Sequence, residues 1–286
     1  MDGYRFTRID TGLGGLPRVR VESPQAEGEM YFHGGQVMSW KPAGMGEVLF
    51  VSREARWKTG RAIRGGVPIC FPWFGPHRSN AQAASHGFVR TKEWTLESIV
   101  ERDEAVTVSM QTESDDAPRC VWPASFRLIH RVTFGRTLTM ALVVTNTGDA
   151  PFHFEEALHT YYRVSHIDRT RIQGLEGLSY LDTLAAPPER IESGVVTFTE
   201  ETDRIYLDPP PAIVIEDGER RVRLSTAGSR AAVVWNPWIA KARALQDLAD
   251  DEWTSFVCVE TCNVRPHEVE LAPGREHVMR VDVSVT

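Results

Sequence analysis

Short stretches in which apolar and polar residues alternate recur along most of this chain, and they constrain its fold more than any other feature. Alternate residues of an extended strand face opposite sides of a sheet, so such stretches predict strands with a buried face. We expect strands at residues 106–110, 126–130, 138–145, 152–156, 213–215, 222–224, 231–235, 255–260 and 279–285. Turn residues separate these stretches, among them Asp217 and Gly218. The pattern therefore predicts an all-β fold, a large antiparallel β-sandwich with few short helices.

Helical patterns are scarce. Residues 242–250 predict a short surface helix, and residues 54–58 could form a single turn. A chain of 286 residues without a Gly/Ser linker or a fixed repeat suits one large sandwich, so we expect a single domain over residues 1–286. A boundary near residues 65–76 is the weaker alternative. Residues 57–85 show no strand pattern, and long structured loops are usually functional.

The overall composition excludes several classes of protein. The formal net charge is −7, with 42% hydrophobic and 25% charged residues, as in a folded globular protein. A general nucleic-acid binder needs a broad basic surface, which this acidic chain lacks. Apolar residues never run for the roughly 18–20 positions that span a bilayer, and charges interrupt the first nine residues. We therefore expect a cytoplasmic protein with no nucleic-acid or membrane partner.

The four cysteines match no metal-binding spacing. They are Cys70, Cys120, Cys258 and Cys262. In an intracellular protein this usage predicts reduced and mostly buried thiols.

Residues 51–92 contrast with the acidic remainder of the chain. They hold eight basic residues and one acid, so their local charge is +7 and the other residues sum to −14. The cations are Arg53, Arg56, Lys58, Arg61, Arg64, Arg78, Arg90 and Lys92. Because Gly, Pro and aromatic residues lie among them, a binding surface for a small polar anion, such as a phosphorylated sugar, is more attractive than surface charge alone.

Two predicted strands carry candidate acid–base residues. On a strand, His153, Glu155 and His159 share one face, which is either an ordinary solvated face or a ligand-lined one. An imidazole titrates near ~6.5 and can exchange protons at neutral pH. Glu260 ends an apolar strand, as a solvated carboxylate or as a partly buried one with a raised pKa. Trp235, and Trp238 after it, could stack on a sugar or pack in the core.

Several short motifs occur in order along the chain and together resemble a known family. They are Arg64-Gly-Gly-Val-Pro-Ile-Cys-Phe-Pro-Trp-Phe-Gly-Pro, His86-Gly-Phe-Val-Arg90, Ala157-Leu-His159-Thr-Tyr, Asp203-Arg-Ile-Tyr206, Trp235-Asn-Pro-Trp238 and Cys258-Val-Glu260. The set resembles the glucose-6-phosphate 1-epimerases, the hexose-6-phosphate mutarotases of the aldose 1-epimerase superfamily, from about Gly34 to the C-terminus.

The resemblance implies a sandwich of galactose-mutarotase type, a monomer, and a reaction on a hexose phosphate that needs neither metal nor cofactor. It assigns His159 and Glu260 as the catalytic pair. It also assigns substrate contacts to Arg64, Ser85, His86, Arg90 and Asp203, with Arg64 and Arg90 as the phosphate candidates. The implied reaction interconverts the α and β anomers, with Glu260 as base at O1 and His159 as acid at O5.

Two other functions remain open from the residues themselves. A β-sandwich glycosidase or lyase could pair Glu155 or Asp203 with Glu260, because inverting glycosidases use two carboxylates about 6.5–9.5 Å apart. A non-catalytic module binding a carbohydrate phosphate could retain the same fold. The chain also departs from the family pattern at Thr261 and Cys262, beside the candidate glutamate.

Overall fold

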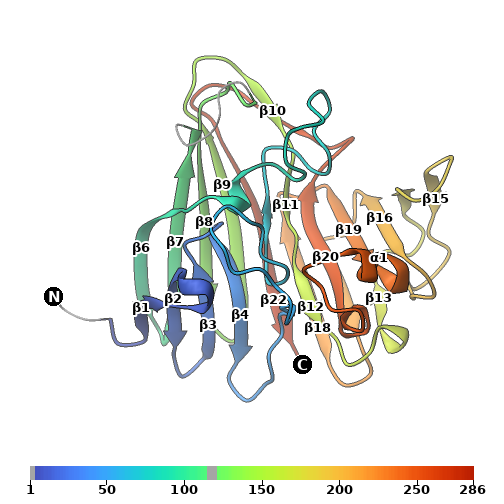
Figure 1. Ribbon diagram of the computed structural model, residues 1–286, viewed down its shortest axis with the longest axis horizontal. Coiled ribbons are helices and arrows are strands. Elements are labelled where there is room, and N and C mark those ends of the chain that lie inside the picture. The colour runs from blue at the N-terminus through green and yellow to red at the C-terminus, as the bar shows by residue number, and fades with distance from the viewer. Residues whose placement is uncertain (1–3, 115–120) are drawn as a thin grey trace.

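Two large antiparallel sheets face each other in the computed structural model, which describes residues 4–114 and 121–286 (Figure 1). The first, which we call the β9 sheet, has the order β13-β17-β18-β22-β9-β8-β7-β6. Its strands are β6 (Thr95–Arg102), β7 (Ala105–Glu113), β8 (Phe126–Phe134), β9 (Leu138–Asn146), β13 (Arg171–Gln173), β17 (Ala212–Glu216), β18 (Arg221–Ala227) and β22 (Glu276–Val285).

The second, which we call the β20 sheet, has the order β15-β14-β16-β19-β20-β11-β5, with β12 also paired to β20. Its strands are β5 (Ile69–Cys70), β11 (Glu156–Leu158), β12 (Tyr161–Arg163), β14 (Ser179–Asp182), β15 (Glu189–Ile191), β16 (Thr202–Leu207), β19 (Ala231–Asn236) and β20 (Phe256–Asn263). The predicted antiparallel sandwich is confirmed.

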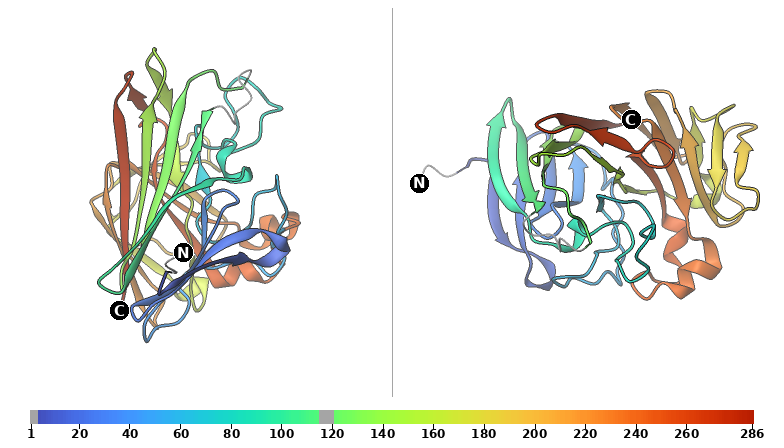
Figure 2. Two further views of the ribbon diagram at one scale, coloured as in Figure 1. Left: turned by 90° about the vertical axis from the view of Figure 1, so that its left-hand side faces the viewer. Right: turned by 90° about the horizontal axis from the view of Figure 1, so that it is seen from above.

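A smaller sheet near the N-terminus covers one end of the β9 sheet. It consists of β1 (Thr7–Thr11), β2 (Pro17–Glu22), β3 (Ala26–Tyr31) and β4 (Gln36–Pro42). The Trp40 indole donates a hydrogen bond of 3.0 Å to the Gly135 carbonyl beyond β8, which ties the two sheets together. Figure 2 shows β1–β4 on the same side of the β9 sheet as the short helix α1 (Trp238–Ala244). A further pair joins β10 (Phe152–Phe154) to β21 (Val269–Leu271).

The β20 strand is buried along its whole length because both of its faces are covered. Val257 and Val259 belong to the main core between the two large sheets. Phe256 and Cys258 face the other way, into a second apolar cluster that also includes Cys70 and Trp235. This second face is where the loops of residues 57–85 and the α1 region cover the sheet.

The structure confirms most of the predicted strands and corrects some local details. Residues 152–163 form three short strands instead of one, because they pair in turn with β21, with β5 and β20, and with β20 alone. The helix predicted at residues 242–250 begins earlier and ends at Ala244. It begins there because the Asn236 side chain accepts the Trp238 amide. Residues 54–58 form no helix.

Turns and irregular segments behave as the sequence predicted. Asp217 accepts the Glu219 and Arg220 amides in the turn between β17 and β18. Residues 57–85 are irregular apart from β5 and isolated bridges. Further helical turns in the described part of the chain include η1 (Leu13–Gly15), η2 (Val89–Thr91), η4 (Ile167–Arg169) and η5 (Glu252–Ser255).

The predicted burial of free cysteines is confirmed where it can be observed. Cys70, Cys258 and Cys262 are unpaired and buried, and Cys120 lies outside the described residues. None of the helices within residues 4–114 and 121–286 is both long and apolar enough to traverse a bilayer.

Candidate active site

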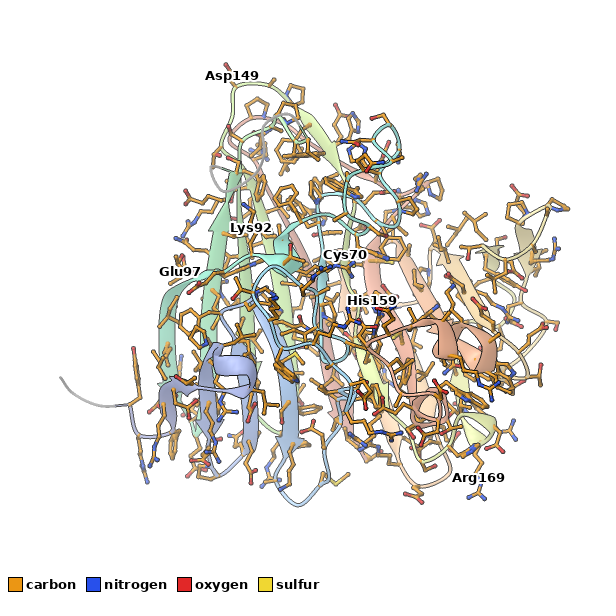
Figure 3. The ribbon with its side chains drawn as sticks, viewed as in Figure 1. Cys70, Lys92, Glu97, Asp149, His159 and Arg169 are labelled. Atoms are coloured by element: carbon orange, nitrogen blue, oxygen red, sulfur yellow. The ribbon has the colours of Figure 1, made fainter. Side chains whose placement is uncertain are left out.

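A cavity of about 520 Å³ lies on the face of the β20 sheet that points away from the β9 sheet. Its walls come from the loops of residues 62–90, from β16, β19 and β20, and from the α1 region. Figure 3 labels His159 near the middle of the molecule, close to Cys70. All seven residues selected from the sequence line this one cavity: Arg64, Ser85, His86, Arg90, His159, Asp203 and Glu260.

His159 and Glu260 form a direct pair at the base of the cavity. Nε2 of His159 lies 3.3 Å from Oε1 of Glu260, and the side chains are 10% and 1% exposed. Glu260 reaches the cavity because residues 256, 258, 260 and 262 share one face of β20. His159 follows β11, where its amide donates to the Pro68 carbonyl at 2.9 Å.

The surroundings of this pair favour its uncharged form. Burial raises the pKa of Glu260 well above its ordinary value, and nearby Asp203 adds to this while Arg90 opposes it. Burial also lowers the pKa of His159 well below its ordinary value, and His86 and Arg90 reinforce the effect. Neither Nδ1 of His159 nor Oε2 of Glu260 has a hydrogen-bond partner among the described residues. Both atoms are thus buried polar atoms without a compensating hydrogen bond, which is consistent with the uncharged form of the pair.

His86 supplies a neutral hydrogen-bond donor. The Gly75 amide donates to its Nδ1 at 3.3 Å, so the ring proton resides on Nε2. Burial, together with the charges of Arg90 and Arg64, lowers the pKa of His86 to about 3. Its ring centroid lies 5.8 Å from that of His159. A neutral imidazole in this position can donate to a sugar oxygen without carrying a charge.

The glycines of the Arg64-Gly-Gly motif serve the protein backbone instead of a ligand. Gly65 has φ +118°, and a Cβ there would lie 2.4 Å from the Val51 Cα. Gly66 has φ +61°, and its Cβ would lie 2.2 Å from the Val37 carbonyl oxygen. Neither glycine lines the cavity. These contacts instead bring Arg64 to the cavity wall.

The four cations that line the cavity differ in their partners. Arg64 pairs with Asp247, Lys241 pairs with Glu201, and Arg265 pairs with Glu155. Arg90 has no carboxylate partner within the described residues, and its Nη2 donates to the Ser85 carbonyl at 2.8 Å. Arg90 is thus the cavity cation whose charge is least compensated.

Asp203 of β16 and Trp235 of β19 are paired on neighbouring strands, and both line the cavity. Burial raises the pKa of Asp203 above its ordinary value. The Trp235 ring lies edge-on to His159, with centroids 5.8 Å apart. Trp238 instead packs on Trp253 at 4.4 Å and does not line the cavity. Of the two candidate sugar platforms, the structure therefore retains Trp235.

Sequence reasoning missed several cavity residues, above all Asp247 and Arg265, whereas Tyr161 belongs to the Ala157-Leu-His159-Thr-Tyr motif that the sequence analysis identified. Asp247 belongs to the acidic segment of residues 246–252, which follows α1. In the sequence, the charge of this acidic segment is complementary to that of the basic residues 53–64. Only the fold shows that the two segments are in contact.

Glu155 is excluded as the second carboxylate of a glycosidase. It does not line the main cavity but a smaller one of about 370 Å³, with His153 and two tryptophans. Its oxygens accept hydrogen bonds from the Phe74 amide at 2.9 Å and the Arg265 amide at 3.1 Å. Among the described residues, no group of three or more His, Cys, Asp or Glu side chains is arranged to hold a metal ion.

Comparisons with known proteins point to one family. The sequence model of the aldose 1-epimerase family matches residues 17–284. A protein of Cenchrus ciliaris named "Putative glucose-6-phosphate 1-epimerase" is 38% identical over 268 residues, which cover 90% of this chain and 80% of that protein. A protein of Salmonella typhimurium with the same name is 36% identical over 252 residues, covering 87% of this chain and 84% of that protein.

Solved structures share the architecture. The crystal structure of a "putative mutarotase" from Salmonella typhimurium has a TM-score of 0.92 at 32% identity, covering 99% of this chain and 94% of that one. A galactose mutarotase related enzyme from Lactobacillus acidophilus has a TM-score of 0.75 at 12% identity, covering 94% and 97%. The second likeness shows the fold alone.

Proposed function

The chain belongs to the aldose 1-epimerase family, and we propose that it interconverts the α and β anomers of a hexose 6-phosphate such as glucose 6-phosphate. The observation that carries the proposal is the buried His159–Glu260 pair, 3.3 Å apart, in a cavity that also presents Arg90. The isomerase reaction is that of the family. The phosphorylated substrate rests on the names of the relatives and on the cations of the cavity.

The reaction requires two coupled proton transfers. Ring opening removes the proton from the O1 hydroxyl and adds one to O5, and ring closure on the other face of the carbonyl reverses both steps. We assign Glu260 as the base at O1 and His159 as the acid at O5. Positioned groups of this kind each contribute about 10²–10⁴-fold.

The pair suits this chemistry because a single proton, held either by His159 or by Glu260, is enough for both transfers. With Glu260 ionised and His159 protonated, the sugar ring can open. After opening, Glu260 holds the proton and His159 is neutral, which is the form that burial favours. The uncharged pair is thus the form of both the unliganded site and the open-chain intermediate, and transfer of the proton from Glu260 to His159 across their 3.3 Å contact precedes each ring opening. His86 and Asp203 would hold the sugar hydroxyls and keep the aldehyde in place for closure.

We assign the phosphate group to Arg90 first. A guanidinium offers a planar fork of donors that matches phosphate oxygens, and Arg90 is the cavity cation without a carboxylate partner in the described part of the chain. Ser85 supports this role through its carbonyl, which holds Nη2 of Arg90 at 2.8 Å.

NMR exchange spectroscopy on equilibrated glucose 6-phosphate, with free glucose measured alongside, tests the proposal. We expect enzyme-dependent exchange between the α and β anomers, faster for the phosphorylated sugar. Release of reducing ends from an oligosaccharide without such exchange would support the glycosidase. Binding of the sugar phosphate without exchange would support a non-catalytic module.

A substitution of Arg90 tests the phosphate assignment. Arg90→Ala should raise KM for the phosphorylated sugar on the order of tenfold to a hundredfold, because a charge-assisted contact is lost, and should change KM for the free sugar little. Arg61→Ala is the matched control, since Arg61 is an exposed cation of the same segment that does not line the cavity. Equal effects of Arg90→Ala on both sugars would contradict the assignment.

A further inference from the structure

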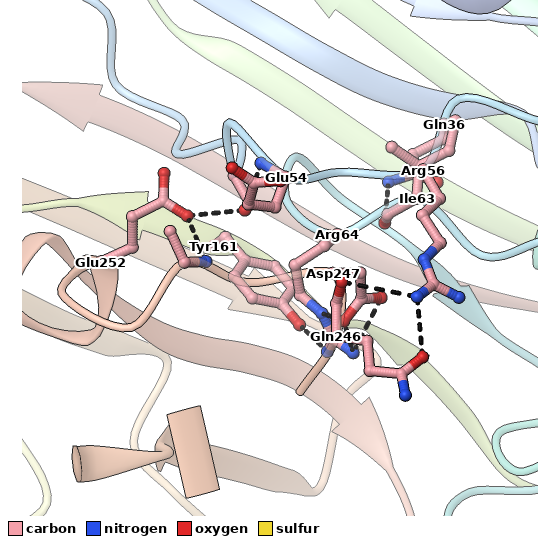
Figure 4. A network of polar contacts seen from close by, with 11 residues as sticks. Gln36, Glu54, Arg56, Ile63, Arg64, Tyr161, Gln246, Asp247 and Glu252 are labelled. Carbon is pink, nitrogen blue, oxygen red and sulfur yellow. Dashed lines mark hydrogen bonds and ion pairs between the residues drawn. The ribbon is translucent and has the colours of Figure 1, made fainter. Parts of the chain in front are cut away.

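Arg64 is held on two sides by other residues of the protein (Figure 4). Its Nε donates to Oδ1 of Asp247 at 3.2 Å, and its Nη2 contacts both Asp247 oxygens at 3.0 and 3.2 Å. Its Nη1 donates to the Tyr161 hydroxyl at 3.0 Å. Each of the three guanidinium nitrogens therefore has a protein partner, which distinguishes Arg64 from Arg90.

Tyr161 connects this arginine to the catalytic pair. Its ring stacks on the His159 ring, with centroids 5.0 Å apart and an angle of 10° between the planes. Tyr161 is 2% exposed, and its amide donates to the Gly66 carbonyl at 2.9 Å, close to Arg64 in the chain. The stacked ring fixes the plane of the imidazole, and the bond to Arg64 fixes the stacked ring.

The segment that carries Asp247 is itself anchored. Buried Glu252 accepts the Ser52 hydroxyl at 2.6 Å and the Arg53 amide at 2.9 Å. Arg56 donates to the Gln246 side chain at 2.8 Å, and the exposed residues Arg53 and Asp251 form an ion pair. The basic residues 53–64 thus dock the acidic residues 246–252 onto the cavity wall. Most of these cations therefore bind residues of the protein itself, and we assign them no role in attracting the substrate.

We propose that Asp247, Arg64 and Tyr161 form a chain that positions His159 for proton transfer, with Asp247 compensating the Arg64 charge beside the imidazole. Asp247 and Tyr161 are positioning residues in this proposal, because they act through other groups. The proposal rests on the proposed function in that it takes His159 as a catalytic acid. It assigns Arg64 a part in the chemistry in addition to any contact with phosphate.

The charge at His159 gives the proposal a definite sign. Asp247→Asn would leave the Arg64 charge uncompensated and lower the pKa of His159 further, since a nearby cation disfavours the imidazolium. Tyr161→Phe would instead retain the stacked ring and remove only the bond to Arg64. The titratable and charged groups that face His159 from the surrounding elements are Glu260, His86, Arg90, Arg64 and Tyr161.

The first experiment compares kcat and KM for glucose 6-phosphate and free glucose in Tyr161→Phe and Asp247→Asn. We expect kcat to fall on the order of tenfold to a hundredfold for both sugars, because the acid is displaced, with much smaller changes in KM for free glucose. The acidic limb of the kcat profile should move to lower pH in Asp247→Asn, and Asp247→Glu should recover much of the activity.

Asp251→Asn is the matched control. It removes a carboxylate of the same acidic segment whose arginine partner is exposed and outside the cavity, so kcat should remain unchanged. If Asp247→Asn and Tyr161→Phe change only KM for the phosphorylated sugar and leave kcat for free glucose intact, Arg64 is a phosphate contact alone and the chain is refuted.

A spectroscopic measurement separates this proposal from the proposed function. The ring nuclei of His159 can be followed by NMR against pH, whether or not the protein isomerises a hexose phosphate. A downward shift of the His159 pKa in Asp247→Asn, absent in Asp251→Asn, supports the charge coupling. An unchanged pKa refutes it. Loss of anomer exchange in the unmodified protein would instead refute the proposed function.

Discussion

Two histidine–glutamate pairs lie within a few residues of each other, yet they reside on opposite faces of the β20 sheet. His159 and Glu260 face the cavity, 3.3 Å apart. Glu156 faces the β9 sheet, and His277 of β22 reaches it from that sheet, with Nε2 of His277 2.7 Å from Oε1 of Glu156. Glu156 immediately precedes the Ala-Leu-His159 motif, so the chain builds both pairs from neighbouring positions.

The two pairs differ in the sign of their histidine pKa shift. Burial alone would lower the pKa of His277, but the hydrogen bond and charge of Glu156 outweigh it and raise that pKa. Burial dominates at His159 and lowers its pKa. The Asn263 side-chain amide also donates to Oε1 of Glu156 at 2.9 Å, whereas Oε1 of Glu260 has only its contact with His159 in the described part of the chain. Oε2 has no partner within the described residues in either glutamate.

The comparison shows that additional donors, and not residue type, decide whether such a pair is charged. A carboxylate that accepts several hydrogen bonds remains ionised and binds an imidazolium as a structural link. A buried carboxyl left without them has a raised pKa and keeps its proton nearer neutral pH, which suits a group that must exchange protons with a substrate. The protein uses the first arrangement for stability and, in our proposal, the second for turnover.

The largest expected effect is on turnover. Glu260→Gln and His159→Ala should each lose about 10²–10⁴-fold in kcat while still binding the sugar phosphate, because each removes one proton-transfer group. Glu156→Gln, the matched change at the other pair, should retain kcat in the folded protein. Anomer exchange by NMR measures all three, and full activity of Glu260→Gln would remove the distinction between the pairs.

The next effect is on stability, where the change at Glu156 should matter more than the change at Glu260. Glu156→Gln should lower the free energy of unfolding by about 2 kcal/mol, because His277 loses a charge-assisted bond. Glu260→Gln should lower it less or raise it, since Glu260 has few compensating donors. Urea unfolding of the two variants decides this, and an equal loss in both would show that the pairs have similar structural roles.

A third effect is the opposite pH dependence of the two histidines. The raised pKa of His277 means that the folded state binds the proton more tightly, so its contribution to stability is full below about pH 6.5 and is lost as the pH rises through the folded value. His159 has a lowered pKa, so the protein should lose stability as the pH falls below about 6.5.

Stability curves of His277→Gln and His159→Gln against pH test these signs. His277→Gln should remove the loss on the alkaline side, and His159→Gln the loss on the acidic side. Slopes of the same sign in the two variants would contradict the assigned protonation states.

The smallest effect comes from adding a donor near Glu260. Cys262→Ser places a hydroxyl on the same face of β20, where it can donate to Glu260 and lower the pKa of that carboxyl. The alkaline limb of the kcat profile should move to lower pH, with a stability change of about 1 kcal/mol. Cys262→Ala is the control, and an identical pH profile in both variants would show that the hydroxyl does not reach Glu260.

Much of the fold and the candidate site could be predicted from the sequence alone. Alternation identified β7, β8, β9 and β17–β20, because a strand with one buried face leaves a period of two in the sequence. The family resemblance selected seven site residues, and all seven line the cavity. Strands β1–β4 were missed, and residues 152–163 were assigned to one strand because breaks in pairing leave no local signal.

The tertiary structure decided what those residues can do. Arg64 and Arg90 look equivalent in the sequence, but the fold places Asp247 against one and a backbone carbonyl against the other. His159 and His277 are likewise both histidines near a glutamate, but their pKa values shift in opposite directions. Composition and periodicity fix which residues are buried, whereas charge depends on distances of a few ångströms between residues far apart in the chain, and only the packed structure sets those distances.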